Sequence, residues 1–156
     1  MKKFLSLLCL IIMSVPLFAD MSKTELQQMY LSFFRSQGIP AEIDEDGDIR
    51  FEYKGDFSQA MTYYIIVDEY DQQFFAIVKI AGYSLDTAQE KRQGPLAASA
   101  ACGEARIAKV YINNDGDNII ASAETFLVSP GDFKAVFTKL MRGIQHALSV
   151  FVDGME

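Results

Sequence analysis

One stretch of the sequence, AEIDEDGDIRFEY, gathers acidic side chains around a single glycine, Gly47. A calcium loop of the helix–loop–helix type needs acids at its first, third and fifth positions, glycine at the sixth and a bidentate acid at the twelfth. With Gly47 at the sixth position, Glu42, Asp44 and Asp46 fall on the first three of these ligand positions. The twelfth position is then Tyr53, which cannot complete the coordination shell. The ligand count therefore favours a tight turn, and we expect no metal site.

The apolar residues around the same stretch alternate, which indicates two antiparallel strands joined by a short loop. A three-residue loop at 45–47 sets Ile43 opposite Ile49. The same loop sets Ala41 opposite Phe51. A two-residue turn would instead place Ile43 opposite a charged residue, so only the longer loop keeps apolar side chains on one face. The glycine that ends the loop suits its left-handed position.

Other residues that could take part in catalysis are few. The single histidine, His146, lies about 140° from the apolar stripe of its predicted helix, so we expect it to face solvent without an orienting partner. Asp68 and Glu69 are adjacent carboxylates that a weak hydrolase could use. The sequence contains no CxxC, HExxH or glycine-rich phosphate-binding motif. We predict a protein that is not an enzyme and that has no cofactor.

The N-terminal residues are typical of a secretory signal peptide. Two lysines precede an apolar run at 4–13, and Ala19 suits a cleavage site. The run is too short for a transmembrane helix. We therefore expect removal of residues 1–19, a single domain at 20–156, a periplasmic or secreted location and no stable membrane insertion after cleavage.

Loss of this leader changes both the charge and the cysteine content. The formal net charge falls from −7 to −9 because Lys2 and Lys3 are removed. An acidic surface of this kind repels phosphate backbones, and we therefore expect no nucleic-acid partner. Cys9 is also removed, and Cys102 alone cannot form an intrachain disulfide. Its small-residue surroundings predict that Cys102 is buried.

The elements that must position these residues can be read from the apolar spacing. A capping box at Ser22–Glu25 starts a helix that Gly38 ends. Two runs that are apolar on both faces, 61–67 and 74–80, predict central strands. A helical segment at 84–102 follows. We expect Gly94-Pro95 to interrupt it, leaving two short helices or a loop and one helix.

The C-terminal third of the sequence predicts one more hairpin and a long helix. Strands are expected at 106–112 and 118–128, joined by the loop at 113–117. Ser129-Pro130 then starts a helix with an apolar stripe. The stripe consists of Phe133, Val136, Phe137, Leu140, Ile144, Leu148 and Phe151. The order of elements is α-ββ-ββ-α-ββ-α, which predicts an α+β fold, an antiparallel sheet of five or six strands with helices on one face.

The stretches IDEDGDIRFEY and ARIAKVYINNDGDNIIASAETFLVSPGDFKAVFTKLM, with the apolar strand pair between them, resemble the YbjN family. That family is similar to the type III secretion chaperone fold. The resemblance covers nearly all of the chain after the leader and rests on hairpins and apolar spacing. It implies a regulator of sensory transduction without catalytic residues, and its fold relatives are dimeric chaperones that bind extended segments of partners.

These observations lead to a non-enzymatic protein-interaction, chaperone-like or regulatory module of the bacterial envelope. Its partner would be another protein or a second copy of itself. The aromatic residues Tyr53, Tyr63, Phe75 and Tyr111 are candidates to line the sheet face that binds this partner. The alternative is a small-ligand binding protein with an apolar pocket between sheet and helices.

Overall fold

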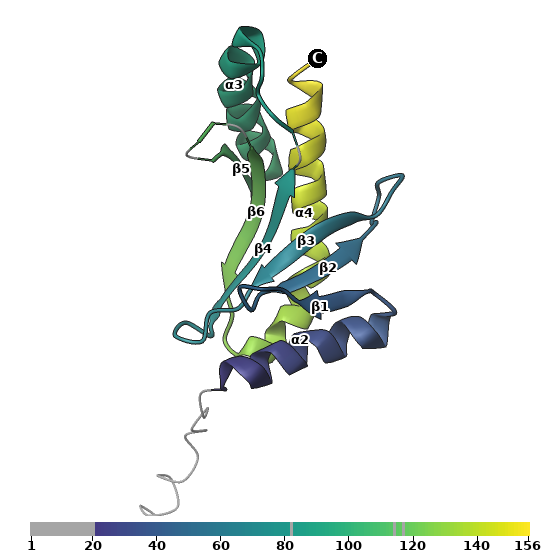
Figure 1. Ribbon diagram of the computed structural model, residues 1–156. Coiled ribbons are helices and arrows are strands. Elements are labelled where there is room, and N and C mark those ends of the chain that lie inside the picture. The colour runs from purple at the N-terminus through teal and green to yellow at the C-terminus, as the bar shows by residue number, and fades with distance from the viewer. Residues whose placement is uncertain (1–20, 82, 114, 117) are drawn as a thin grey trace, which may run out of the picture.

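The computed structural model describes residues 21–81, 83–113, 115–116 and 118–156. The elements in chain order are α2 (Lys23–Gln37), β1 (Ala41–Ile43), β2 (Ile49–Tyr53), β3 (Met61–Ile66), β4 (Phe74–Ala81), α3 (Ala88–Ala105), β5 (Lys109–Ile112), β6 (Ile119–Phe126), a 3-10 turn (Pro130–Asp132) and α4 (Phe133–Asp153). The strands form one antiparallel sheet in the order β1-β2-β3-β4-β6-β5. The predicted α+β class and sheet are confirmed, and Figure 1 shows the sheet in front of α4.

The acidic hairpin has the predicted register. Ile43 pairs with Ile49 and Ala41 pairs with Phe51, as the three-residue loop requires. The backbone N–H of Asp44 donates to the carbonyl of Asp48 over 2.9 Å and closes the loop. Gly47 has a φ of 88°, a left-handed conformation that glycine adopts without a steric penalty.

The second half of the sheet does not follow chain order. β6 pairs along its whole length with β4, from Phe74 opposite Phe126 to Ala81 opposite Ile119. The preceding strand, β5, therefore lies at the sheet edge and pairs only with β6. Both strands are shorter than the predicted 106–112 and 118–128.

The α-helices of the described residues, α2, α3 and α4, pack on one face of the sheet. From α2, Phe34 stacks on Phe51 of β2 with ring centroids 4.5 Å apart. The ring of Tyr30 stacks on Phe75 of β4 with centroids 5.9 Å apart. Figure 1 shows α4 running behind the strands, with α3 beside its upper end. The predicted α4 stripe is buried except for Val136, which is half-buried. Aromatic and aliphatic burial on this single face forms the hydrophobic core.

The segment around Gly94 and Pro95 corrects a prediction. α3 is one continuous helix through both residues, not two short helices or a loop and a helix. Its N-terminus has a capping box between Thr87 and Glu90 that the sequence reasoning missed. Buried small residues on α3, including Ala101, lie in the core against α4 and β5. This packing outweighs the missing N–H of the proline.

The predicted leader at 1–19, with Cys9, lies outside the described residues. None of the helices in the described ranges combines the length and the hydropathy needed to cross a bilayer.

Candidate functional site

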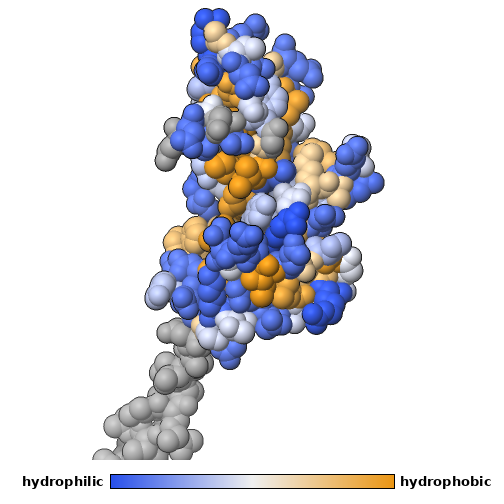
Figure 2. Space-filling view, viewed as in Figure 1, coloured by the Kyte–Doolittle hydropathy of each residue, from blue (hydrophilic) through white to orange (hydrophobic). Residues whose placement is uncertain are grey.

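The sheet face opposite the helices is uncovered by any described element. Because side chains alternate along a strand, Phe75 and Ile77 of β4 point to the helices, while Val78 and Ile80 point to the other side. We call this other side the open face. Its apolar side chains are Tyr64, Ile66, Phe74, Val78, Ile80, Tyr111, Ile120 and Phe126. Figure 2 shows apolar groups over β4 and β6 with hydrophilic groups around them.

The apolar residues of the open face lie beside one another across the strands. Ile80 pairs with Ile120, which pairs in turn with Tyr111 at the sheet edge. At the other end of β4, the rings of Phe74 and Phe126 are 5.7 Å apart. Ile80, Tyr111 and Phe126 are 48%, 43% and 73% exposed. An apolar surface of this kind on a folded chain is typical of an interaction site.

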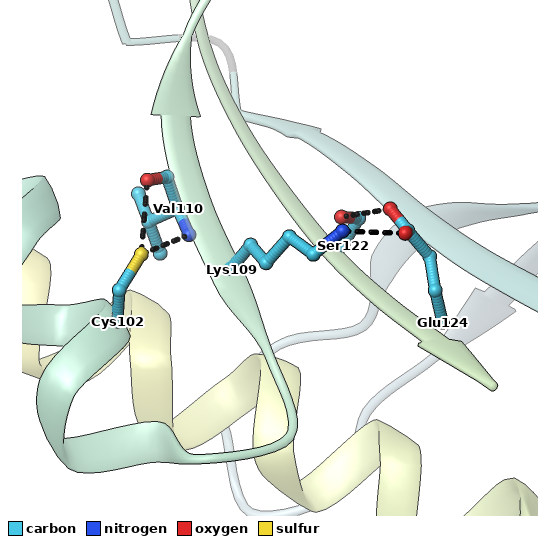
Figure 3. A network of polar contacts seen from close by, with 5 residues as sticks. All are labelled: Cys102, Lys109, Val110, Ser122 and Glu124. Atoms are coloured by element: carbon cyan, nitrogen blue, oxygen red, sulfur yellow. Dashed lines mark hydrogen bonds and ion pairs between the residues drawn. The ribbon is translucent and has the colours of Figure 1, made fainter.

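Two ion pairs lie on the open face. The Arg50 guanidinium is 2.6 Å from the Glu42 carboxylate, and the hydrogen bond raises the pKa of Arg50. Figure 3 shows the second pair, in which Lys109 Nζ lies 2.5 Å from the Glu124 carboxylate. Lys109 lowers the pKa of Glu124 in return, and the Ser122 hydroxyl donates to Glu124 over 3.0 Å. Arg50 and Lys109 on the open face are therefore already paired with carboxylates.

The acidic hairpin loop adds a negative edge to the same face. A depression of about 360 Å³ has Asp44, Glu45 and Asp46 on one side and apolar residues such as Ile66 and Ile80 on the other. Within the loop, Asp44 accepts hydrogen bonds from the backbone N–H groups of Asp46 and Asp48, at 3.0 and 2.9 Å. These bonds are turn chemistry. In the ranges the structure describes, no three His, Cys, Asp or Glu side chains are grouped as metal ligands would be.

Asp48 has a second structural role. Its carboxylate accepts the backbone N–H of Val67 over 2.8 Å, at the end of β3. Burial raises the pKa of Asp48, with a smaller contribution from the nearby Asp44 charge. The Asp48 carboxylate is therefore partly desolvated where it links the hairpin loop to the end of β3.

The four aromatic residues predicted to line one binding face do not share a face. Tyr63 and Phe75 are fully buried between sheet and helices, with 0% exposure. Tyr53 is half-buried on the same side, 5.8 Å from Phe137 of α4. Only Tyr111 lies on the open face. The other three residues lie on the core side, because Tyr53 is two positions from Phe51, Tyr63 pairs with Phe51, and Phe75 alternates with the buried Ile77.

Apart from Tyr111, the residues that form the open face were missed. Ile80 was expected in a central strand, and Ile120 and Phe126 in a strand of the second hairpin, but none of the three was expected at a binding face. Alternation could have identified this face. Once every second residue of β4 and β6 is assigned to the core, the residues between them must point to the other side of the sheet.

A pocket lies between the sheet and α4. Such a pocket was named from the sequence as an alternative, but the residues that line it were not identified. It has a volume of about 460 Å³ and lies beside the last turns of α4. Its lining is formed by Phe57, Ala60, Met61, Lys79, Ala81, Tyr83, Leu148 and Val152. Lys79 is the only charged side chain in this described lining. Its position on the helix-facing side of β4 follows from alternation with Ile77 and Ala81.

The remaining candidates have structural explanations. His146 is exposed on α4, as predicted. Asp68 accepts the backbone N–H groups of Tyr70 and Asp71 at 2.8 and 3.2 Å, so its carboxylate stabilises a turn. Cys102 was expected to be buried and is half-buried. Its sulfur contacts the backbone N–H and carbonyl of Val110 at 3.2 and 3.3 Å (Figure 3).

No family model matches this chain, and no curated protein matches its sequence.

Proposed function

We propose that this protein is a non-enzymatic interaction module of the bacterial envelope, chaperone-like or regulatory, that binds a partner protein through the open face. The observation that carries the proposal is the exposure of Ile80, Tyr111 and Phe126 on a sheet face that no described helix covers. Aromatic and isoleucine side chains supply much of the contact energy in protein interfaces. Burying them against a partner removes apolar surface from water.

The charges around the open face favour a partner segment that is apolar and basic. The acids of the hairpin loop face the depression beside Ile80, whereas Arg50 and Lys109 already pair with carboxylates. Lysine or arginine on the partner would find complementary charge at this edge. The acidic net charge, −7 for the full chain and −9 without Lys2 and Lys3, disfavours a second copy of this chain on the same face.

The cellular location and the family belong to the same proposal. The leader-like residues 1–19 support export, and thus a periplasmic or secreted protein. The resemblance to the YbjN family supports a regulatory or chaperone-like role, since its fold relatives bind extended segments of partners. Fractionation of cells that express the tagged protein tests the location, and recovery in the cytoplasm with an intact leader would contradict it.

Site-specific crosslinking in living cells tests the binding face. A photoreactive phenylalanine analogue replaces Phe126 or Tyr111, both on the open face, and Arg142, which is exposed on α4. We expect the two open-face positions to crosslink to the same partner, and the Arg142 position to give no such product. The partner is identified by mass spectrometry and purified. Its affinity for the protein should then fall at least about tenfold with Ile80→Glu and stay unchanged with Arg142→Glu.

Two results would overturn this proposal. Products that are the same from Arg142 as from the open face would show that the face has no special role. A product that contains only this chain would mean that the face joins two copies, and not a different protein.

The pocket beside α4 favours a second candidate function, the binding of a small ligand. Its volume of about 460 Å³ lies within the common range for ligand sites, and most of its lining is apolar. Native mass spectrometry of the purified protein tests this function. A retained small molecule that Val152→Trp at the pocket rim displaces would support it, whereas a ligand-free protein that takes up no amphiphile would contradict it.

A further inference from the structure

We infer that the pocket between β3, β4 and α4 binds a single-chain amphiphile with a carboxylate head group, which Lys79 pairs with inside the pocket. This inference refines the second candidate function and is independent of the open face. Nothing in the sequence pattern singled out Lys79, because most of its pocket partners come from other elements, among them β3 and α4.

The walls of the pocket suit an alkyl chain. Met61 and Ala81 come from the sheet, and Leu148 and Val152 come from α4. Phe57 precedes β3 and supplies an aromatic wall. No aspartate or glutamate is part of the described lining. An alkyl chain placed here would leave water and contact carbon atoms from several elements.

Lys79 gives the pocket its one charge. The residue lies on β4 between Ile77, which is fully buried, and the pocket residue Ala81. Its Nζ donates to the backbone carbonyl of Ile80 over 2.8 Å, which leaves further N–H groups of the ammonium for other acceptors. Burial lowers the pKa of Lys79. No carboxylate in the described part of the chain lies within ion-pair distance of it.

A half-buried ammonium without a carboxylate is energetically unfavourable, and an anionic ligand head would relieve this cost. A carboxylate is the head group that matches it most directly, since a charge-assisted hydrogen bond with Lys forms at short distance. A cationic or zwitterionic head would place positive charge beside Lys79. The charge of the pocket therefore selects among amphiphiles that its walls would otherwise bind equally.

The geometry also orients the ligand. Lys79 lies on the sheet side, whereas Val152 on the last turns of α4 is 48% exposed at the rim. The head group is therefore expected at Lys79, with the alkyl chain packed along Leu148 and Val152. Substitution at Val152 would obstruct the chain without touching the ion pair.

Calorimetric titration of the purified protein with decanoate and with decanol tests the inference. Lys79→Met keeps the length and apolar stem of the side chain but removes its charge. We expect this variant to bind decanoate at least about tenfold more weakly and decanol as before. Lys79→Arg should retain decanoate binding. Lys134→Met, at an exposed lysine of α4, is the matched control and should change neither affinity.

A stability measurement separates a binding role from a structural one. Because Lys79→Met removes a half-buried charge, its melting temperature should equal or exceed that of the native protein. A variant that loses decanoate binding together with its fold would show that Lys79 is structural, and would overturn the inference.

The two ligands also separate this inference from the function it refines. Equal binding of decanoate and decanol by the native protein and by Lys79→Met would overturn the carboxylate preference but leave a ligand-binding pocket. Binding of neither compound would overturn both the inference and the small-ligand function.

Discussion

At the scale of single residues, several polar groups that the sequence offers as chemistry are used to hold the backbone. Asp48 joins the hairpin loop to Val67 at the end of β3, and Asp44 accepts two N–H groups of its own loop. Gln145 of α4 is buried, donates to the carbonyl of Lys54 over 3.0 Å and accepts the N–H of Asp56 over 3.2 Å. Loops that connect the strands are thus tied down by single side chains.

The raised pKa of Asp48 predicts a pH-dependent effect of Asp48→Asn. A carboxyl whose pKa is higher in the folded state favours folding in its protonated form, and this contribution is lost as pH rises through the raised value. Asparagine keeps the oxygen that accepts the Val67 N–H but has no charge. We expect Asp48→Asn to be more stable than the native protein by about 0.5 kcal/mol or less at neutral pH, since solvent screens this half-exposed group.

Urea unfolding at several pH values measures this difference. The gain should disappear as pH falls below the ordinary range of an aspartate, because the native carboxyl is then neutral too. Asp48→Ala is the control that removes the acceptor, and it should cost about 1–2 kcal/mol at every pH. A gain for Asp48→Asn that persists in acid would contradict the electrostatic explanation.

Cys102 protects the edge strand β5. Its sulfur contacts the backbone N–H and carbonyl of Val110, a residue that is almost fully buried. Cys102→Ala would leave these groups without a partner, and we expect it to lower the free energy of unfolding by about 1–2 kcal/mol. Cys102→Ser keeps a donor and an acceptor and should lose less. Chemical denaturation checks the order, and an alanine variant as stable as native would rule out this role.

At the scale of elements, α3 shows that tertiary packing decides whether a proline ends a helix. Pro95 is exposed within the helix, where it has no N–H to donate to the carbonyl of Lys91. Gly94 is buried, and a Cβ built on it would lie 2.9 Å from Leu85 Cδ1. The two residues that suggested a break therefore have different roles.

This difference predicts opposite results for two alanine substitutions. Pro95→Ala restores a helical hydrogen bond at an exposed position and should stabilise the protein by about 1 kcal/mol or more. Gly94→Ala should not give the gain of about 1 kcal/mol expected from helix propensity, because its methyl group displaces Leu85. Thermal unfolding followed by far-UV circular dichroism compares the two. A more stable Gly94→Ala would show that this contact is loose.

At the scale of the whole molecule, the aromatic residues are divided between a covered and an open sheet face. Phe75 is fully buried beneath α2 and α4, whereas Phe126 is 73% exposed. The covered face stabilises the fold, and the open face is available to a partner. Both faces of β4 are apolar, so the sheet has more apolar surface than its own helices bury.

This division predicts which aromatic residues are needed for folding. Phe75→Ala should lower the free energy of unfolding by about 3–5 kcal/mol, because it leaves a cavity in the core. Phe126→Ala and Tyr111→Ala should each change it by no more than about 0.5 kcal/mol. Equilibrium unfolding in urea measures all three. A large loss from Phe126→Ala would mean that the open face is part of the folded core.

The sequence by itself determined the local structure of this protein. The capping box at Ser22, the glycine at 47 and the period of apolar residues in 61–67 and 74–80 are short-range signals, and each led to the correct element or register. The α+β class followed from the order of these elements. Such signals are readable because they depend on residues a few positions apart.

The tertiary structure alone decided which sheet face the helices cover, and therefore where Tyr63, Phe75 and Ile80 lie. It also decided that α3 continues through Pro95 and that Lys79 meets Leu148 and Val152 in one pocket. Alternation separates the two faces of a strand, but β4 is apolar on both, so its pattern cannot assign one of them to the core. Which face is covered depends on contacts between residues far apart in the sequence, and local spacing carries no information about those contacts.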